Sequence, residues 1–161
     1  MRQLVTPALL WCSAIGCGLM AGVYFAFSTF IMTALARTGP GPGMAAMNAI
    51  DVEIVRSLFM PLFLATTLTS AALAVVACFR LGEPGAVAAL AGGVIYVLGM
   101  FVATMVFNVP LNDALAAADA SSAEGAALWA RYLGDWTLWN HVRTVASVAA
   151  AVLFTMALAA R

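Results

Sequence analysis

Charged residues are scarce in this sequence, and lysine is missing altogether. Only 9% of the 161 residues are charged, and seven arginines balance seven acidic residues to a formal net charge of zero. A soluble domain has about 25% charged residues, and a nucleic-acid-binding surface requires clustered basic side chains. The composition therefore excludes an ordinary soluble domain and indicates no nucleic-acid partner.

Cysteine and histidine are also few, and their spacing indicates no metal or redox centre. Cys12, Cys17 and Cys78 lie inside apolar runs without the spacing of a metal-binding or redox pair, so they are expected to be small core residues. The only histidine is His141, and one histidine does not supply the two-histidine, one-carboxylate set of non-haem iron. No phosphate-binding loop or haem-attachment motif is present. No cofactor is evident, and a haem or metal ligated by His141 stays an open alternative.

Apolar residues, by contrast, make up 65% of the chain and form four long runs. A transmembrane helix needs about 20 consecutive apolar residues. The runs predict an all-α integral membrane protein, with residues 1–161 forming one domain. Its four-transmembrane-helix bundle is expected to have spans at about residues 4–35, 58–79, 86–107 and 142–160. The first run is much longer than the roughly 7–15 apolar residues of a signal peptide, so a span is favoured over a cleaved leader.

The two long connectors between these spans are each expected to contain an interfacial helix. The segment 39–43, GPGPG, ends the first span, since glycine and proline together do not continue a helix. Residues 44–57 then have helical composition with several polar side chains, and residues 113–135 are amphipathic. Pro110 lacks an N–H, so the third span is expected to end in a kinked polar tip.

The arginines also bear on the orientation in the membrane. Four spans place both termini on one side and the long connectors on the other. The arginines divide almost evenly between the sides, so the positive-inside rule decides little. If Arg56 and Arg143 act within the protein, the remaining arginines favour termini in the cytoplasm, and the location would be the cytoplasmic membrane in a bacterium.

Most of the polar residues fall on the connector side, where ionisable groups near the bilayer are functional candidates. The segment 136–144, WTLWNHVRT, is the densest group. On an ideal helix Asn140 and Arg143 lie within about 40° of Trp136, whereas His141 lies about 140° away. His141 and Arg143 therefore cannot share one narrow face. Either the helix presents two inward faces, or it is irregular near Asn140.

The charged candidates each have a structural and a chemical interpretation. His141 is either a buried, hydrogen-bonded histidine or a general base, because its imidazole can accept a proton near neutral pH. Arg143 either pairs with an acid such as Asp51 or Glu53 or stabilises a developing oxyanion.

The neutral candidates have the same two interpretations. Asn108, Asn112 and Asn140 either orient a carbonyl or phenol, or satisfy broken backbone at the kink. Tyr24 and Phe27 either pack in the core, which is favoured, or line a site for a flat hydrophobic substrate.

Several of these segments together resemble the anthrone-oxygenase-like family, small four-helix membrane proteins long described as a domain of unknown function. The similarity covers nearly the whole chain, and its most specific pair is NVPLN at 108–112 followed by WNHVRT at 139–144. In this resemblance the family motifs are carried by Asn108, Asn112, Trp136, Asn140, His141 and Arg143. The chain departs from the pattern at Asp51 and Arg56, where a compensating pair is expected, and this departure leaves the substrate open.

The resemblance implies a membrane-embedded oxidoreductase or oxygenase acting on a hydrophobic phenolic or quinone-like molecule. We expect His141 to remove a proton while Arg143 and Asn108, Asn112 and Asn140 stabilise the anion. The substrate-binding residues would be Trp136, Asp51, Arg56, Tyr24 and Phe27. The anion could react with oxygen directly, so no cofactor is obligatory.

The alternative function is a non-catalytic membrane subunit or hydrophobic-ligand binder whose polar cap docks a partner. Gly18 and Gly22 form a small-xxx-small pair, which permits close packing either within the chain or in a homo-oligomer.

Overall fold

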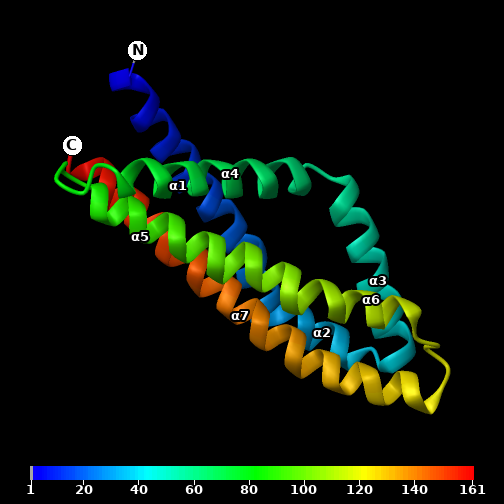
Figure 1. Cartoon of the computed structure of the whole chain (residues 1–161). Coiled ribbons are helices and arrows are strands. Elements are labelled where there is room, and N and C mark those ends of the chain that lie inside the picture. Colours follow the sequence, from blue (N-terminus) through cyan, green and yellow to red (C-terminus); the bar gives the residue numbers. More distant parts are fainter. Residues whose placement is uncertain (1) are drawn as a thin grey trace.

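The computed structural model describes residues 2–161, with side chains from residue 6 onward, and every regular element in this range is helical. Figure 1 shows long helices running side by side, with both termini at the end that carries the α4–α5 turn. The elements are α1 (Arg2–Ala26), η1 (Phe27–Ile31), α2 (Met32–Arg37), α3 (Pro40–Arg56), α4 (Phe59–Cys78), α5 (Ala86–Tyr96), η2 (Val97–Val102), η3 (Thr104–Asn108), α6 (Val109–Ala117) and α7 (Ala123–Ala159).

Four continuous helical segments are long and apolar enough to cross a membrane, which confirms the predicted all-α, four-span fold. They are Thr6–Arg37, Phe59–Cys78, Ala86–Ala117 and Ala123–Ala159. At 1.5 Å per residue, α4 is about 30 Å long and matches the hydrocarbon thickness. The other three segments contain 32, 32 and 37 residues. They therefore continue beyond the hydrocarbon region.

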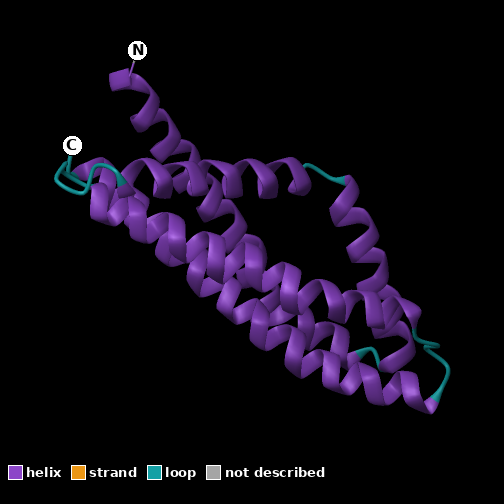
Figure 2. Ribbon diagram, viewed as in Figure 1, coloured by secondary structure: helices purple, strands orange, loops and turns teal. Residues whose placement is uncertain are grey.

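The helix bounds differ from the predicted spans at the connectors. The first connector contains the separate helix expected, α3. The second does not, because α7 runs from residue 123 to 159 without a break, and residues 123–135 form its first turns. Ser122 caps this helix, its Oγ accepting a hydrogen bond from the Gly125 amide at 2.9 Å, and no proline follows within it. The connecting loops are correspondingly short (Figure 2).

The third span also continues past its predicted end. Pro110 lies in α6 directly after the π-helical turn η3, so the helical segment continues past a residue that has no N–H to donate. Two π-helical turns, η2 and η3, precede it. Such turns occur frequently at functional sites, and here Thr104 and Met105 of η3 line the cavity described below.

The helices are held by two clusters of buried side chains. One lies among the spans and includes Tyr96, Met100 and Phe154. The other lies on the connector side and includes Met44 and Trp129. α4 and α5 approach closely because Gly93 has no side chain; a Cβ at this position would be 2.5 Å from the Ser70 carbonyl oxygen.

Two of the three cysteines, all of which were expected in the core, instead face outward. Cys17 is buried as expected, but Cys12 and Cys78 are exposed on outer surfaces. Gly18 and Gly22 are exposed too, and a Cβ on either would meet nothing within 4 Å. The glycine pair therefore does not pack against another helix of the same chain.

Candidate functional site

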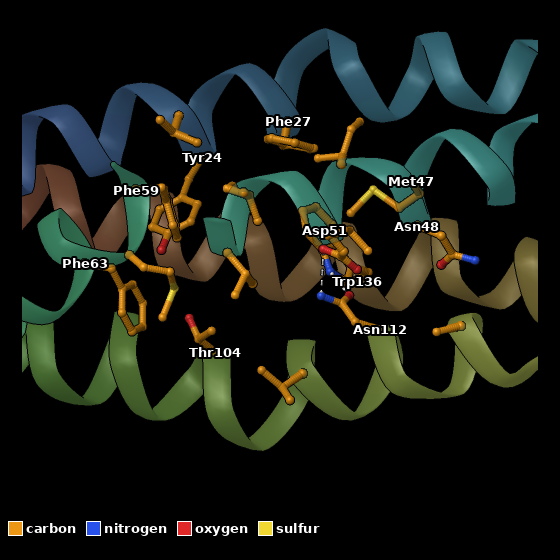
Figure 3. A pocket seen from close by; sticks show the side chains of 18 of the residues that line it. Tyr24, Phe27, Met47, Asn48, Asp51, Phe59, Phe63, Thr104, Asn112 and Trp136 are labelled. Carbon is orange, nitrogen blue, oxygen red and sulfur yellow. Dashed lines mark hydrogen bonds between the residues drawn. The ribbon is translucent and has the colours of Figure 1, made fainter. Parts of the chain in front are cut away.

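A cavity of about 760 Å³ lies on the connector side of the bundle, where α4 begins. Its volume falls within the roughly 300–1,000 Å³ typical of sites for small organic ligands. Much of its wall is apolar or aromatic, and Figure 3 shows Phe59, Phe63, Phe27 and Met47 around it. α1, η1, α3, α4, η3, α6 and α7 all contribute to the wall. The cavity therefore has the size and the apolar lining of a site for a small hydrophobic molecule.

The cavity forms because α3 and α4 are not one straight helix. Ser57 is extended, with φ −91° and ψ 179°. Its hydroxyl donates to the Ile54 carbonyl at 2.8 Å and accepts from the Phe59 amide at 3.1 Å, so it satisfies backbone groups at both helix ends. Figure 1 shows α3 leaving α4 at an angle and returning toward α6. The space inside this bend is lined by residues of both helices.

Arg143 brings a buried guanidinium group to the cavity wall. Its side chain is only 5% exposed. Its Nη2 donates to Asn140 Oδ1 at 2.9 Å, and its Nη1 lies 3.5 Å from Thr104 Oγ1. Its Cζ lies 4.5 Å from the ring centre of Tyr24 and 4.9 Å from that of Trp136, within the range of cation–π attraction. All four contacts are with neutral groups.

Asp51 lies on α3 and is held by a hydrogen-bonded asparagine. Asn112 Nδ2 donates to Asp51 Oδ1 at 3.0 Å. The carbonyl oxygen of the same amide accepts from Tyr132 Oη and from Trp136 Nε1, each at 2.8 Å. Two donors on one side fix the amide orientation and direct its NH₂ group at the carboxyl. Figure 3 shows Asp51, Asn112 and Trp136 gathered in this way.

The environment of Asp51 moves its titration toward neutral pH. The pKa of the carboxyl is raised to about 6: burial raises it most, the positive charge of Arg143 partly opposes the rise, and the Asp113 carboxylate adds to it. A carboxyl with this pKa exchanges a proton readily near physiological pH, as a general base requires. A perturbed carboxyl in an apolar cavity is also a recognised mark of a functional site.

Seven of the ten site residues expected from the sequence line this one cavity. They are Tyr24, Phe27, Asp51, Arg56, Asn112, Trp136 and Arg143. Asp51 and Arg56, however, do not form the ion pair expected of them; within the described residues the only charged pair within 4.0 Å is Arg80–Glu83.

Asn108 and Asn140 lie behind the cavity wall. Asn140 Nδ2 donates to the Tyr24 carbonyl and to Ser28 Oγ, both at 2.7 Å, while its Oδ1 receives Arg143. Asn108 Nδ2 donates to the Trp136 carbonyl at 3.2 Å. The two asparagines therefore position cavity residues and do not line the cavity themselves.

His141 is the candidate that the structure does not bring to the cavity. Its side chain is exposed, whereas Arg143 is buried. His141 and Arg143 are two positions apart, which corresponds to a rotation of about 200° around a helix. Only one of the two side chains can therefore point from α7 into the bundle. Nor does any group of three His, Cys, Asp or Glu side chains in the described chain lie close enough to hold a metal ion. The base expected at His141 has a better-placed counterpart in Asp51.

Sequence reasoning missed several residues of the cavity. Thr104 lies within an apolar run, and only the packing of η3 against α7 brings its hydroxyl near Arg143. Phe59 and Phe63 are four residues apart on α4, and this spacing could have predicted that both lie on one face of the helix. Asp113 follows Asn112 directly and lines the same cavity.

A family model described as anthrone oxygenase matches residues 53–153. The match includes Asn112, Trp136 and Arg143, and it begins two residues after Asp51. No curated protein and no solved structure matches the chain.

Proposed function

The chain belongs to the anthrone oxygenase family, and from this membership and the chemistry of the cavity we propose a membrane-embedded oxygenase of flat, hydrophobic, phenolic substrates. One observation carries the proposal. A carboxyl with a pKa near 6, Asp51, and a buried guanidinium, Arg143, face the same largely apolar cavity. This pair of groups suits the removal of a carbon-bound proton followed by stabilisation of the resulting anion.

An anthrone illustrates the chemistry. Its CH₂ group lies between two aryl rings and opposite a carbonyl, so loss of one proton gives an anion whose charge is shared with the carbonyl oxygen. Asp51 accepts that proton, and Arg143 stabilises the negative oxygen. Asn112 holds the carboxylate in place through its amide. The aromatic side chains of Phe27 and Phe59 contact the faces of the substrate.

The anion then reduces molecular oxygen. Electrons pass from the carbanion to O₂, and a carbon–oxygen bond forms. After proton uptake the product is a hydroperoxide, which loses its remaining hydrogen on the same carbon together with hydroxide. The products are a second carbonyl and one water. This stoichiometry consumes one O₂ per substrate and balances without a further reductant.

Replacement of Asp51 tests the proposal. The Asp51→Asn variant keeps a hydrogen-bonding side chain but cannot accept the proton, so oxygen consumption with a hydroxyanthrone should fall by about 10²–10⁴-fold, the usual contribution of a general base. Incorporation of ¹⁸O from ¹⁸O₂ into the quinone identifies the oxygen source. Wild-type turnover by Asp51→Asn would exclude Asp51 as the base.

Two matched variants make this test specific. Glu53 is an exposed acid two residues away on α3 and does not line the cavity, so Glu53→Gln should retain full activity. His141→Ala should also retain activity, because the imidazole does not reach the cavity. If His141→Ala abolishes turnover instead, metal analysis and the optical spectrum of both proteins decide whether the histidine holds a haem or a metal ion.

A hydrophobic-ligand binder is the second candidate, and the predominantly apolar cavity wall favours it equally. Mass spectrometry of small molecules extracted from the purified protein separates the two functions. A bound quinone-like lipid that is never turned over supports the binder. Conversion of an added anthrone supports the enzyme.

A further inference from the structure

The positive charge of Arg143 has no negative partner in the protein. None of the carboxylates in the described part of the chain lies within 4.0 Å of it. Its hydrogen-bond partners, Asn140 and Thr104, are neutral, and its Nε atom is buried without a hydrogen-bond partner. Burial of a charge is costly unless it is paired. A ligand that supplies negative charge would recover part of that cost.

The surroundings of Arg143 hold its charge at the cavity rather than neutralise it. The side-chain nitrogen of Asn140 donates to the Tyr24 carbonyl on α1 and to the Ser28 hydroxyl on η1. These bonds keep the side-chain oxygen of Asn140 directed at the guanidinium. The rings of Tyr24 and Trp136 lie within 5 Å of Cζ. Rings and amide together restrict the arginine to the position in which it lines the cavity. The protein therefore presents a pre-oriented cation to whatever enters.

The rest of the cavity narrows the chemistry of the ligand. The other titratable groups that line it are Asp51, Asp113, Arg56 and Tyr24. The two carboxylates disfavour a ligand with several negative charges, such as a phosphate ester. The apolar wall favours an aromatic body, and a guanidinium is weakly hydrated and pairs well with a delocalised oxyanion. A monoanion with its charge shared over an aromatic ring meets all of these conditions.

We infer that the cavity binds its aromatic ligand as a phenolate, with the ionised ring oxygen at Arg143. This inference rests on the proposed function and names the form in which its substrate is bound. Phenols that carry an ionisable hydroxyl are selected over their methyl ethers. The arginine therefore acts at the binding step. When Asp51 later removes a proton from carbon, the ring oxygen takes up a proton from solvent, so the ligand remains a monoanion.

A hydroxyanthraquinone is a suitable probe, because its absorption changes when the hydroxyl ionises and it is not itself an anthrone. Wild-type protein in detergent should lower the apparent pKa of the bound hydroxyl by at least about one unit, equivalent to a tenfold preference for the phenolate. The methyl ether of the same compound should bind at least about tenfold more weakly at a pH where the phenol is ionised. This comparison requires only the unmodified protein.

Variants identify the group responsible. Arg143→Gln should abolish the shift in the probe's titration, and Arg143→Lys should retain part of it. Arg56→Gln removes an exposed charge from the same cavity and should change the shift much less. Asp51→Asn should enlarge the shift, because it removes a negative charge that opposes the phenolate. Thermal unfolding of each variant verifies that it is folded.

The outcomes also separate this inference from the proposed function. Equal affinity for the phenol and its methyl ether, or an undiminished shift in folded Arg143→Gln, would overturn the inference. An enzyme that oxidises anthrones but shows no preference for ionised phenols would retain the function and refute the phenolate. A protein that prefers the phenolate but oxidises no anthrone would support the phenolate inference and refute the proposed function.

Discussion

At the scale of single residues, side-chain hydrogen bonds fix the position of the groups that line the cavity. Asn112 is the clearest case. Its side-chain oxygen accepts hydrogen bonds from Tyr132 and Trp136, and its side-chain nitrogen donates one to Asp51. No apolar residue can replace these contacts. The asparagine is a positioning residue that determines where the carboxyl of Asp51 points.

We expect Asn112→Ala to lower turnover about 10–100-fold, because a misplaced base loses its alignment with the substrate. It should also lower the free energy of unfolding by about 1–3 kcal/mol, since the Tyr132 and Trp136 donors lose their acceptor. Turnover and thermal unfolding measure the two effects. Asn48→Ala is the control: Asn48 also lines the cavity, but its Oδ1 has no hydrogen-bond partner. Equal losses in both variants would contradict the role of Asn112.

The pKa of Asp51 predicts the pH dependence of turnover. The base must be ionised, so the rate should rise with pH through about 6 and level off above it. Asp113→Asn should move this midpoint to lower pH, because the Asp113 carboxylate raises the pKa of Asp51. A pH–rate profile of both proteins tests the prediction, and an unchanged midpoint in Asp113→Asn would contradict it.

The same pKa has the opposite effect on stability. The folded-state pKa of Asp51 is raised from 3.8 to about 6, so the folded protein binds this proton more tightly than the unfolded chain. The contribution of Asp51 to stability is therefore full below pH 3.8 and is lost as the pH rises through about 6. Turnover and stability thus depend on opposite protonation states of one carboxyl.

At the scale of helices, close contacts between backbones determine where side chains can lie. Gly93 allows α5 to approach α4, whereas Gly18 on α1 faces away from the bundle. Both glycines lie in apolar segments, and the sequence alone does not distinguish them. Which glycine is structural depends on the rotation of each helix about its own axis.

Gly93→Ala should therefore destabilise the protein by about 1–3 kcal/mol, because its Cβ would overlap the Ser70 carbonyl and the Ala74 side chain. Gly18→Ala should have little effect, since nothing lies within 4 Å of its Cβ. Thermal unfolding in one detergent compares the two. A Gly18→Ala loss as large as that of Gly93→Ala would indicate that the outer face of α1 is covered in the purified protein.

The same helix rotation explains which parts of the site could be predicted. Apolar run length alone predicted the four spans, and topology then placed Asp51, Asn112, Trp136 and Arg143 on one membrane side. Helix periodicity further showed that His141 and Arg143 point in different directions. It could not show which of them faces inward, because that depends on contacts of α7 with Tyr24 and Thr104 from other helices.

The cavity itself could not be predicted for a different reason. It depends on the angle between α3 and α4, which is set by the extended Ser57 and by where α3 packs. The predicted break near Ser57 located the end of a helix but not its new direction. Likewise, the amphipathic pattern of residues 123–135 is the same for an interfacial helix and for the first turns of α7.

At the scale of the whole molecule, the connector side carries the cavity and the opposite side carries both termini. If Arg56 and Arg143 are left out of the count, the remaining arginines favour termini in the cytoplasm, and we predict on this basis that the cavity lies on the outer side of the membrane. In a protein without its native cysteines, a membrane-impermeant thiol reagent added to intact cells should label Ser121→Cys in the α6–α7 loop. It should not label Gly82→Cys in the α4–α5 turn. The reverse pattern would invert the orientation.

The depth of the cavity in the membrane determines how substrate reaches it. α4 is about as long as the hydrocarbon is thick, and the cavity lies at the end where α4 begins. The neighbouring Leu58 is 86% exposed and Val55 is 59% exposed, so the rim of the cavity is apolar where the bilayer surface would lie. A flat hydrophobic compound accumulates at that surface by partitioning. The concentration that governs saturation is then its mole fraction in the lipid, and KM expressed per litre of buffer should fall as more lipid-soluble substrates are used.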